Sequence, residues 1–198
     1  MITNGAYDVP AGKVAEVVTY LEMRAAPEIQ PVEPPEGVAF RQVTPDVAWF
    51  RDVFDRVGAE WLWFGRRKIT DAALGDILED PKVVNYTLTK DGRDEALLEL
   101  DFRQDGECEL AYFGLTGKLI GTGSGRFLMS KAIALAWARD ISRLHVHTCS
   151  LDSPQALGFY IRSGFTPYKR AVEINDDPRL TGHLPETAGP HVPLIRPE

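Results

Sequence analysis

Alternation of apolar and polar residues is the commonest pattern along the chain, and it predicts a protein rich in β-strands. The alternating segments combine β-branched and aromatic residues and are bounded by glycine, proline or aspartate. The N-terminal one, "VAEVVTYLEMR" (14–24), also fits a short helix, but its β-branched residues favour a strand. The predicted strands are 14–24, 37–43, 83–90, 95–103, 108–116, 143–150 and 165–174.

Helical periodicity and helix-boundary residues mark four further segments. Pro45 and Asp46 suit a helix start, and the periodic pattern continues to a glycine stop at Gly58. Asp71 is the expected N-cap of a short helix that ends before Pro81. The predicted helices are 46–58, 72–80, about 123–139 and 153–164.

The order of these elements predicts an α+β fold with a mostly antiparallel twisted sheet and helices on both faces. A meander of antiparallel strands comes first, and a strand–helix–strand–helix–strand series follows. Within that series, the strands 108–116 and 143–150 should be parallel and joined by a right-handed crossover. We expect three regions: an N-terminal strand and proline-rich linker (1–36), a main domain (37–175) and a proline-rich tail (176–198) with little core-forming content.

Composition excludes several classes of function. The net charge of −7 argues against a nucleic-acid partner. No apolar run is long enough for a membrane span, and the N-terminus lacks a signal-peptide pattern, so we expect a cytoplasmic protein without a membrane partner. Two cysteines, Cys108 and Cys149, make neither a disulfide framework nor a zinc site. Homodimerisation stays open.

The segment "LTGKLIGTGSGRFLM" (115–129) places three alternating glycines directly before a predicted helix. Glycines let successive N–H groups point at one anion, and a helix N-terminus favours negative charge, so a pyrophosphate is a natural ligand. Two known phosphate motifs do not fit, because a Rossmann fingerprint would need glycine in place of Arg126 and a nucleotide P-loop would need it in place of Tyr112. The alternative is a plain glycine-rich turn that only allows close packing.

Two motifs in residues 107–168 resemble the GNAT superfamily of acyl-CoA-dependent N-acetyltransferases. The first, "IGTGSG" (120–125), matches Arg/Gln-x-x-Gly-x-Gly/Ala, with Ile120 in place of the polar residue; a second register, 118–123, also fits. The second lies in "LDSPQALGFYIRSGFTPY" (151–168), where the family has Asn-x-x-Ala-x-x-x-Tyr-x-x-x-Gly-Phe and this chain has Ser in place of Asn. Its matching positions are Ser153, Ala156, Tyr160, Gly164 and Phe165.

The resemblance implies that acetyl-CoA is the cosubstrate, that the central parallel strand pair splays apart, and that an amine attacks the thioester directly. The pyrophosphate would bind the glycine turn, and the backbone near Phe113 and Leu115 would pair with the pantetheine arm and polarise the thioester carbonyl. The residues implied in cofactor binding are Phe113, Leu115, Gly121, Thr122, Gly123, Ser124, Gly125, Arg126 and Ser153.

Two catalytic roles follow from the same resemblance. Glu109 is the candidate general base, with Glu99 or water as rivals; the alternative is a solvated glutamate at a strand end. Tyr160 is the candidate general acid for the leaving thiolate, because a phenol of pKa about 10 can supply a proton; the alternative is a core tyrosine. His145 and His147 share a strand face but lack a third metal ligand, so we expect no metal and favour hydrogen-bonded histidines.

The resemblance implies a primary amine as the acceptor, and we expect this amine to belong to a small molecule. Trp49, Trp61, Trp63 and Phe64 could line its pocket, and core packing is expected for at least two of them. Two alternatives stay open: a non-catalytic protein that binds acyl-CoA, and a protein or peptide N-acetyltransferase.

Overall fold

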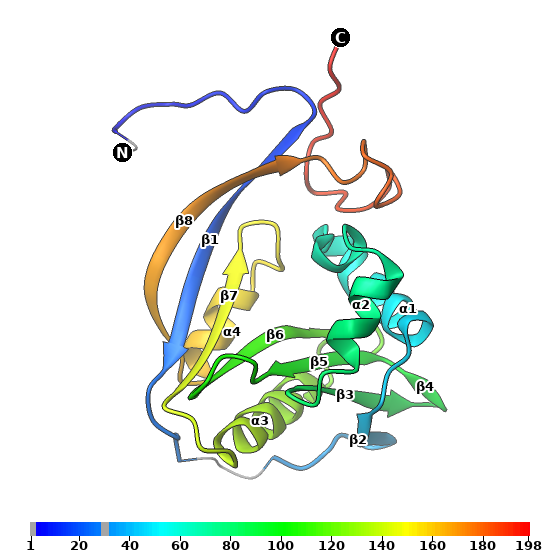
Figure 1. Cartoon of the computed structure of the whole chain (residues 1–198), viewed down its shortest axis with the longest axis vertical. Helices are drawn as coiled ribbons and strands as arrows, with labels where there is room; N and C mark the ends of the chain where they lie inside the picture. The colour runs from blue at the N-terminus through cyan, green and yellow to red at the C-terminus, as the bar shows by residue number, and fades with distance from the viewer. Residues whose placement is uncertain (1–2, 29–31) are drawn as a thin grey trace.

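The computed structural model describes residues 3–28 and 32–198, which form one twisted sheet covered by helices on both faces (Figure 1). The sheet has eight strands in the order β2-β3-β5-β6-β7-β1-β8, with β4 paired to β3. Every pairing is antiparallel except that of β6 with β7. The predicted fold class and the parallel pair are therefore confirmed. The strands are β1 (Lys13–Met23), β2 (Val38–Val43), β3 (Val83–Lys90), β4 (Arg93–Asp94), β5 (Ala96–Asp101), β6 (Glu107–Leu115), β7 (Arg143–Cys149) and β8 (Thr166–Asp176).

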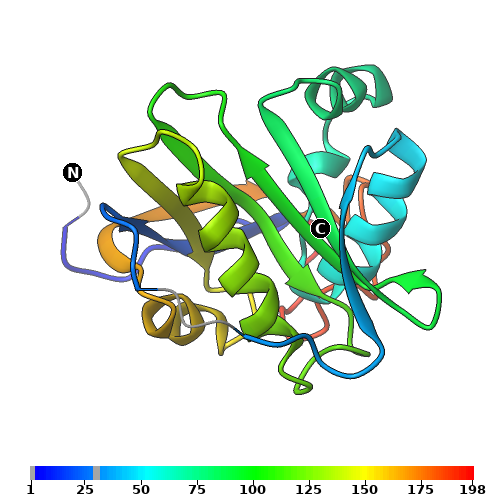
Figure 2. The same cartoon turned by 90° about the horizontal axis from the view of Figure 1, so that it is seen from below.

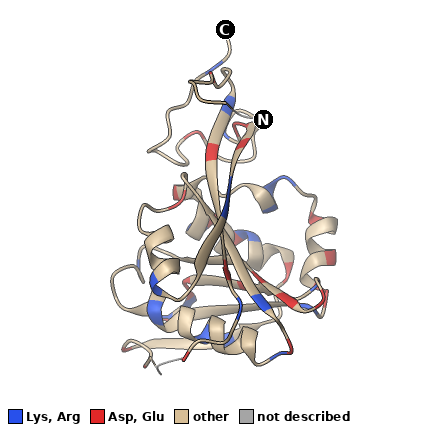
Figure 3. Cartoon of the chain, turned by 90° about the vertical axis from the view of Figure 1, so that its left-hand side faces the viewer, with Lys and Arg blue, Asp and Glu red and all other residues tan. Residues whose placement is uncertain are grey.

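The N-terminal strand β1 lies inside the sheet, between β7 and β8. It is antiparallel to both, with Tyr20 opposite His147 on β7 and Glu16 opposite Glu173 on β8. The segment 1–36 thus contributes a strand to the same sheet as the main region 37–175. Seen from the side of β1 and β8, basic and acidic positions are interspersed along the ribbon (Figure 3).

Four α-helices and two short 3-10 helices cover the sheet in the described part of the chain. Figure 2 shows α3 lying across one face, with α1 and α2 on the opposite side. Asp46 caps α1 as predicted, since its carboxylate accepts a hydrogen bond from the backbone N–H of Trp49. The helices are α1 (Val47–Gly58), η1 (Ala59–Trp61), η2 (Gly65–Arg67), α2 (Asp71–Leu78), α3 (Ser124–Trp137) and α4 (Ala156–Arg162).

The N-cap of α2 differs from the prediction by one residue. Thr70 has the extended backbone of a cap, and its hydroxyl accepts from the N–H of Ala73 at 3.2 Å. Asp71 is the first helical residue instead, and its carboxylate binds Arg51 on α1 at 2.7 Å. Because both Thr and Asp are good caps, the local sequence did not distinguish them.

The apolar core has three parts. The largest lies between the sheet and helices α3 and α4, and a second lies under α1 and α2. The third is built from Val14, Leu62, Leu151, Leu184 and Ala188. Among the described residues, no helix combines the length and apolar character needed to cross a lipid bilayer.

The C-terminal tail is more than a polar extension, and here the sequence prediction was wrong. Leu184 and Ala188 are buried in the third part of the core. Asp177 and Arg179, both 2% exposed, form a two-pronged ion pair, and Arg179 also donates to the carbonyl of Val192 at 2.8 Å. The few apolar residues of the tail become core because they pack onto residues from distant parts of the chain.

Candidate active site

The parallel strands β6 and β7 pair over only three positions and then separate. Their register runs from Glu107 opposite Arg143 to Glu109 opposite His145. Directly after this, β6 has a bulge: its register with β5 shifts so that Ala111 is the extra residue. A bulge bends its strand and increases the local twist. The bulge accounts for the separation, which fits the splayed pair implied by the resemblance.

A cavity of about 640 Å³ occupies the gap between the separated strands. It extends to both faces of the sheet, because its walls come from α3 and α4 on one side and from η1, Trp63 and Phe64 on the other. We call the first part the helix side and the second part the aromatic side. Eight of the candidate site residues line this cavity: Phe113, Leu115, Gly121, Gly123, Gly125, Arg126, Ser153 and Tyr160.

The glycine turn forms one end of the helix side. Gly121 and Gly123 have φ angles of +78° and +87°, a left-handed conformation that side chains disfavour. Gly123 is the N-cap of α3, and the first helical bond runs from the N–H of Phe127 to the carbonyl of Gly123. The N–H groups of Gly125 and Arg126 therefore have no partner within the helix and remain available to a ligand, whereas that of Ser124 donates to the Thr122 hydroxyl at 3.4 Å.

Thr122 and Ser124 shape this turn and do not line the cavity. Their hydroxyls are 2.7 Å apart, and Thr122 also donates to the carbonyl of Leu119 at 2.8 Å. Ser124 is fully buried. Any contact of these two residues with a ligand would come from their backbone.

Gly125 leaves space in the cavity that a side chain at this position would partly fill. A Cβ there would stand 3.6 Å from Leu115 Cδ1 and 3.9 Å from the Phe159 ring. The nearby Ala156 is also small, and Arg126 adds a positive charge to the same end. Backbone N–H groups, an arginine side chain and the space left by two small residues together suit a phosphate group.

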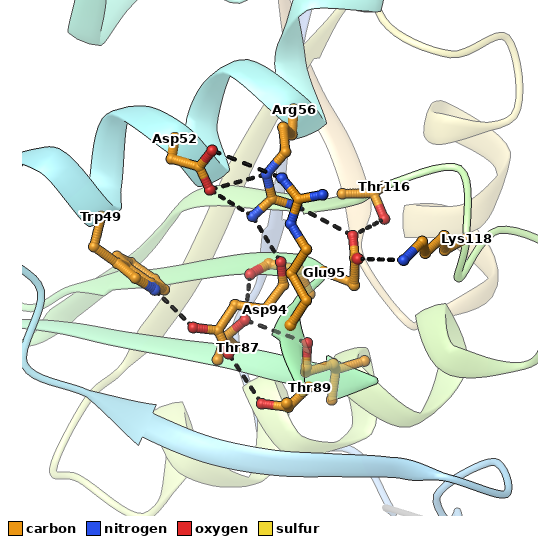
Figure 4. A network of polar contacts seen from close by, with 12 residues as sticks. Trp49, Asp52, Arg56, Thr87, Thr89, Asp94, Glu95, Thr116 and Lys118 are labelled. Carbon is orange, nitrogen blue, oxygen red and sulfur yellow. Dashed lines mark hydrogen bonds and ion pairs between the residues drawn. The ribbon is translucent and has the colours of Figure 1, made fainter. Parts of the chain in front are cut away.

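A polar network holds the segment that leads into the glycine turn (Figure 4). Glu95 is 2% exposed and accepts a hydrogen bond from the hydroxyl of Thr116 at 2.7 Å, while Lys118 lies 3.2 Å and Arg56 3.1 Å from its oxygens. Burial by itself would raise the pKa of Glu95, but the contacts with Thr116 and Lys118 lower it. The carboxylate thus stays charged and ties α1 to the turn. Sequence reasoning missed this network, since its members lie far apart along the chain.

Tyr160 on α4 is 7% exposed and lines the cavity. Its ring packs edge-on against Phe165, with ring centroids 5.9 Å apart. Burial raises the pKa of the phenol well above its usual value, and Asp152 adds to the effect. The hydroxyl has no hydrogen-bond partner among the described residues. It is therefore a protonated group without a structural partner beside the cavity.

Glu109 lies beside the cavity wall but is turned toward His147. Its Oε1 is 3.5 Å from Nδ1 of His147, and this contact holds the pKa of the carboxyl below its ordinary value. His147, unlike Glu109, lines the cavity. His145 lies 3.5 Å from Glu107 in the same manner. In residues 3–28 and 32–198 no group of three or more metal-ligating side chains occurs.

The rival base, Glu99, is fully buried and does not line the cavity. It forms an ion pair with Arg66 at 2.5 Å. Burial raises its pKa, and the charge of Arg66 opposes that effect. Its position under η2 leaves it no direct route to a ligand in the gap.

The aromatic side of the cavity is lined by Trp61, Trp63 and Phe64. Trp49 is not part of it, because its indole N–H donates to Asp94 at 2.7 Å and it packs against the second part of the core. The N–H of Trp63 donates to Asp152 at 3.0 Å. Three of the four aromatic candidates thus reach the cavity. The expected core packing of at least two of the four is confirmed, because Trp49 and Trp63 pack against the second part of the core and Phe64 against the third.

Two carboxylates that the sequence did not single out face the aromatic side. Glu16 on β1 and Glu173 on β8 are opposite each other in the register, and both line the cavity. Burial raises the pKa of Glu16, and the neighbouring Glu173 adds to the effect. Within the described ranges neither forms an ion pair with a lysine or arginine. No local pattern could have indicated this pair, because it is created by the pairing of the two ends of the chain.

Comparisons with known proteins agree with this geometry at the level of the fold. No family model matches the chain, and no curated protein is similar to it in sequence. Many solved structures are similar, and three of them illustrate the likeness. A GCN5-related N-acetyltransferase from Sphaerobacter thermophilus has a TM-score of 0.63 and 16% identity over 82% of this chain and 52% of its own. One from Kribbella flavida has a TM-score of 0.56 and 18% identity, with coverages of 86% and 63%. A tandem GNAT protein from the clavulanic acid biosynthesis pathway has a TM-score of 0.58 and 12% identity, with coverages of 86% and 55%.

The chain therefore has the fold of the GCN5-related N-acetyltransferases, as the two motifs indicated. It spans about half to two thirds of the length of these three structures.

Proposed function

We propose that this protein is an N-acyltransferase that transfers the acetyl group of acetyl-CoA to a primary amine of a small molecule. The observation that carries this proposal is the cavity in the gap between β6 and β7, which joins a glycine turn on one face to an aromatic and acidic surface on the other. A cosubstrate and an acceptor can meet in such a gap from opposite faces.

The helix side suits the acetyl-CoA. Its pyrophosphate would bind the backbone of residues 121–126 and the side chain of Arg126, with Ser153 at the wall formed before α4. The edge of β6 beyond Glu109 has no strand partner on its β7 side in the described chain, so an amide-bearing pantetheine arm can pair with Phe113 and Leu115. A backbone N–H near Leu115 would polarise the thioester carbonyl.

The proposed reaction is a direct transfer. The amine nitrogen attacks the carbonyl carbon, the N–C bond forms and the C–S bond breaks. Tyr160 gives its proton to the departing sulfur, since its phenol is protonated at neutral pH; burial, which raises its pKa, makes it a weaker acid than a free phenol. The amine must lose a proton to a base on the aromatic side.

The aromatic side supports an amine as the acceptor. Glu16 and Glu173 provide negative charge that forms no ion pair with a lysine or arginine of the described chain, and Trp61 offers a ring surface suited to a cation. The ring of Phe64 already holds the Lys68 ammonium, 4.2 Å from its centroid. The whole cavity falls in the usual size range of small-molecule sites, roughly 300–1,000 Å³. Because part of it would hold the pantetheine arm, the remaining space favours a small amine over a folded protein.

The test combines binding with turnover. Calorimetry with acetyl-CoA should show one site, and a thiol-release assay over a panel of small amines, diamines and peptides should show amine-dependent release of CoA, with the acetylated product identified by mass spectrometry. Binding without release for any amine would favour the non-catalytic alternative. Absence of acetyl-CoA binding would refute the proposal altogether.

A further inference from the structure

The proposed transfer needs a base on the aromatic side, and the structure offers a different group there from the one that the sequence suggested. On β7, Leu144 and Val146 belong to the core under α3 and α4, so the alternate residues His145 and His147 face the opposite side of the sheet. Of these two, only His147 lines the cavity. Glu109 faces the same way from β6 but reaches His147 and not the cavity.

The surroundings of His147 suit a group that exchanges protons. Its side chain is 50% exposed, and its ring lies against Tyr20, with ring centroids 5.9 Å apart. The Glu109 carboxylate, 3.5 Å from Nδ1, can accept the proton on that nitrogen. The contact with this carboxylate favours the tautomer that carries its proton on Nδ1, in which the neutral imidazole has its free lone pair on Nε2.

We propose that His147 is the base that takes the amine proton, and that Glu109 is a positioning residue that fixes the tautomer of His147. This inference rests on the proposed transfer. An N–H bond of the ammonium form breaks and its proton bonds to Nε2. The free amine attacks the thioester carbon, the C–S bond breaks, and the sulfur takes a proton from Tyr160. The second proton of the attacking nitrogen then passes through water to the Tyr160 phenolate, which gives the neutral amide and restores the phenol. The imidazolium stands beside the Glu109 carboxylate and returns its proton to water across its exposed face.

The charges around His147 determine the pH at which it works. Glu109 from β6 raises the pKa of the imidazole, and Asp152 after β7 and Glu173 from β8 add to this, while burial opposes it. Glu16 and Tyr20 face it from β1, and His145 is its neighbour on the same side of β7. A base needs its neutral form, so activity should rise with pH through a value above the ordinary imidazole pKa of about 6.5.

The experiment measures kcat/KM against pH for the wild type, His147→Gln and Glu109→Gln, with acetyl-CoA and the best amine of the panel. His183→Gln is the control, because that histidine lies in the tail and binds Thr181. We expect His147→Gln to lose about 10²–10⁴-fold in kcat/KM together with the acidic limb. Glu109→Gln should move the limb to lower pH and reduce the plateau, and the control should match the wild type.

An NMR titration of the His147 ring gives a readout that does not depend on turnover. The His147→Gln spectrum assigns the signal, and Glu109→Gln should lower its pKa; an unchanged pKa would overturn the positioning role. If the acidic limb of the wild-type pH profile lies at about pH 4–5 and moves to higher pH in His147→Gln, Glu109 is the base. If the wild type is active and His147→Gln has the same kcat/KM, the role of His147 is overturned and the proposed transfer is not. If the wild type shows no turnover, the proposed transfer itself is overturned.

Discussion

The rings of Phe113 on β6 and Tyr160 on α4 meet at 67°, with their centroids 6.3 Å apart. Through this contact, the strand edge proposed to bind pantetheine and the phenol proposed to protonate the leaving group share one wall of the cavity. Edge-to-face pairs of this kind fix the relative orientation of two rings.

Tyr160→Phe should therefore keep the ring packing and lose only the proton. We expect kcat to fall by about 10²-fold, within the range for general acid catalysis, while the affinity for acetyl-CoA stays within about twofold, because the removed hydroxyl makes no hydrogen bond in the described chain. Steady-state kinetics and calorimetry measure the two quantities.

The matched control is Tyr168→Phe, since Tyr168 is 45% exposed on β8 and lies outside the cavity lining. If Tyr160→Phe has the same kcat as the control, Tyr160 is not the general acid and only packs in the core.

Gly125→Ala tests the site of the pyrophosphate without straining the backbone. The new methyl group would meet Leu115 and Phe159 at ordinary contact distances of 3.6 and 3.9 Å, and alanine is favoured over glycine in a helix by about 0.5–1 kcal/mol. Stability should thus be maintained while the added group enters the cavity.

We expect the Kd for acetyl-CoA to rise at least tenfold, measured by calorimetry, with a melting temperature no lower than that of the wild type. Gly117→Ala is the control, because a Cβ at Gly117 meets nothing within 4 Å and that residue does not line the cavity. If Gly125→Ala binds acetyl-CoA as well as the control does, the cosubstrate lies elsewhere.

Glu16→Gln tests the acidic part of the aromatic side. The variant keeps the shape of the side chain and removes a charge that has no lysine or arginine partner in the described residues. We expect the KM for the amine to rise about tenfold, as loss of one charge contact of about 1.4 kcal/mol would give, with little change in the affinity for acetyl-CoA. Glu79→Gln is the control, because Glu79 is an exposed residue at the C-cap of α2 and does not line the cavity. An equal KM in both variants would mean that the acceptor does not use Glu16.

Arg179→Met tests whether the tail is part of the folded core. Removal of the guanidinium leaves Asp177 buried without its ion-pair partner, which typically costs about 3 kcal/mol or more. Urea unfolding should show this loss. Arg196→Met, which breaks the exposed pair with Glu186, should leave the unfolding curve unchanged. Equal curves for the two variants would show that the tail contributes nothing to the core.

The pH dependence of that loss has a defined sign. Arg179 lowers the pKa of Asp177 in the folded protein. The resulting stability is present above the unfolded value of about 3.9 and is lost as the pH falls through the folded value. The difference between the wild type and Arg179→Met should therefore shrink when unfolding is measured below about pH 3.9.

The sequence by itself determined the elements and their chemical motifs, because these depend on neighbours along the chain. Alternation located the strands, and Asp46 marked the start of α1, as the structure confirms. The glycines at 121, 123 and 125 predicted a turn at which a ligand can approach the backbone, and these glycines line the cavity. The spacing of Ala156 and Tyr160 predicted that both lie on one side of α4, and both line the cavity. Where two residues were equally good locally, as with Thr70 and Asp71, the choice was made by the fold.

Tertiary structure alone decided which side chains meet. Strand β1 enters the sheet between β7 and β8, which brings Glu16 to Glu173 and Tyr20 to His147. The bulge at Ala111 separates β6 from β7 beyond the position where Glu109 contacts His147. The tail becomes part of the core because Leu184 packs in one cluster with Leu62 and Leu151. Such contacts join residues far apart in the chain, and they depend on strand order, register and burial, quantities that no local pattern of residues encodes.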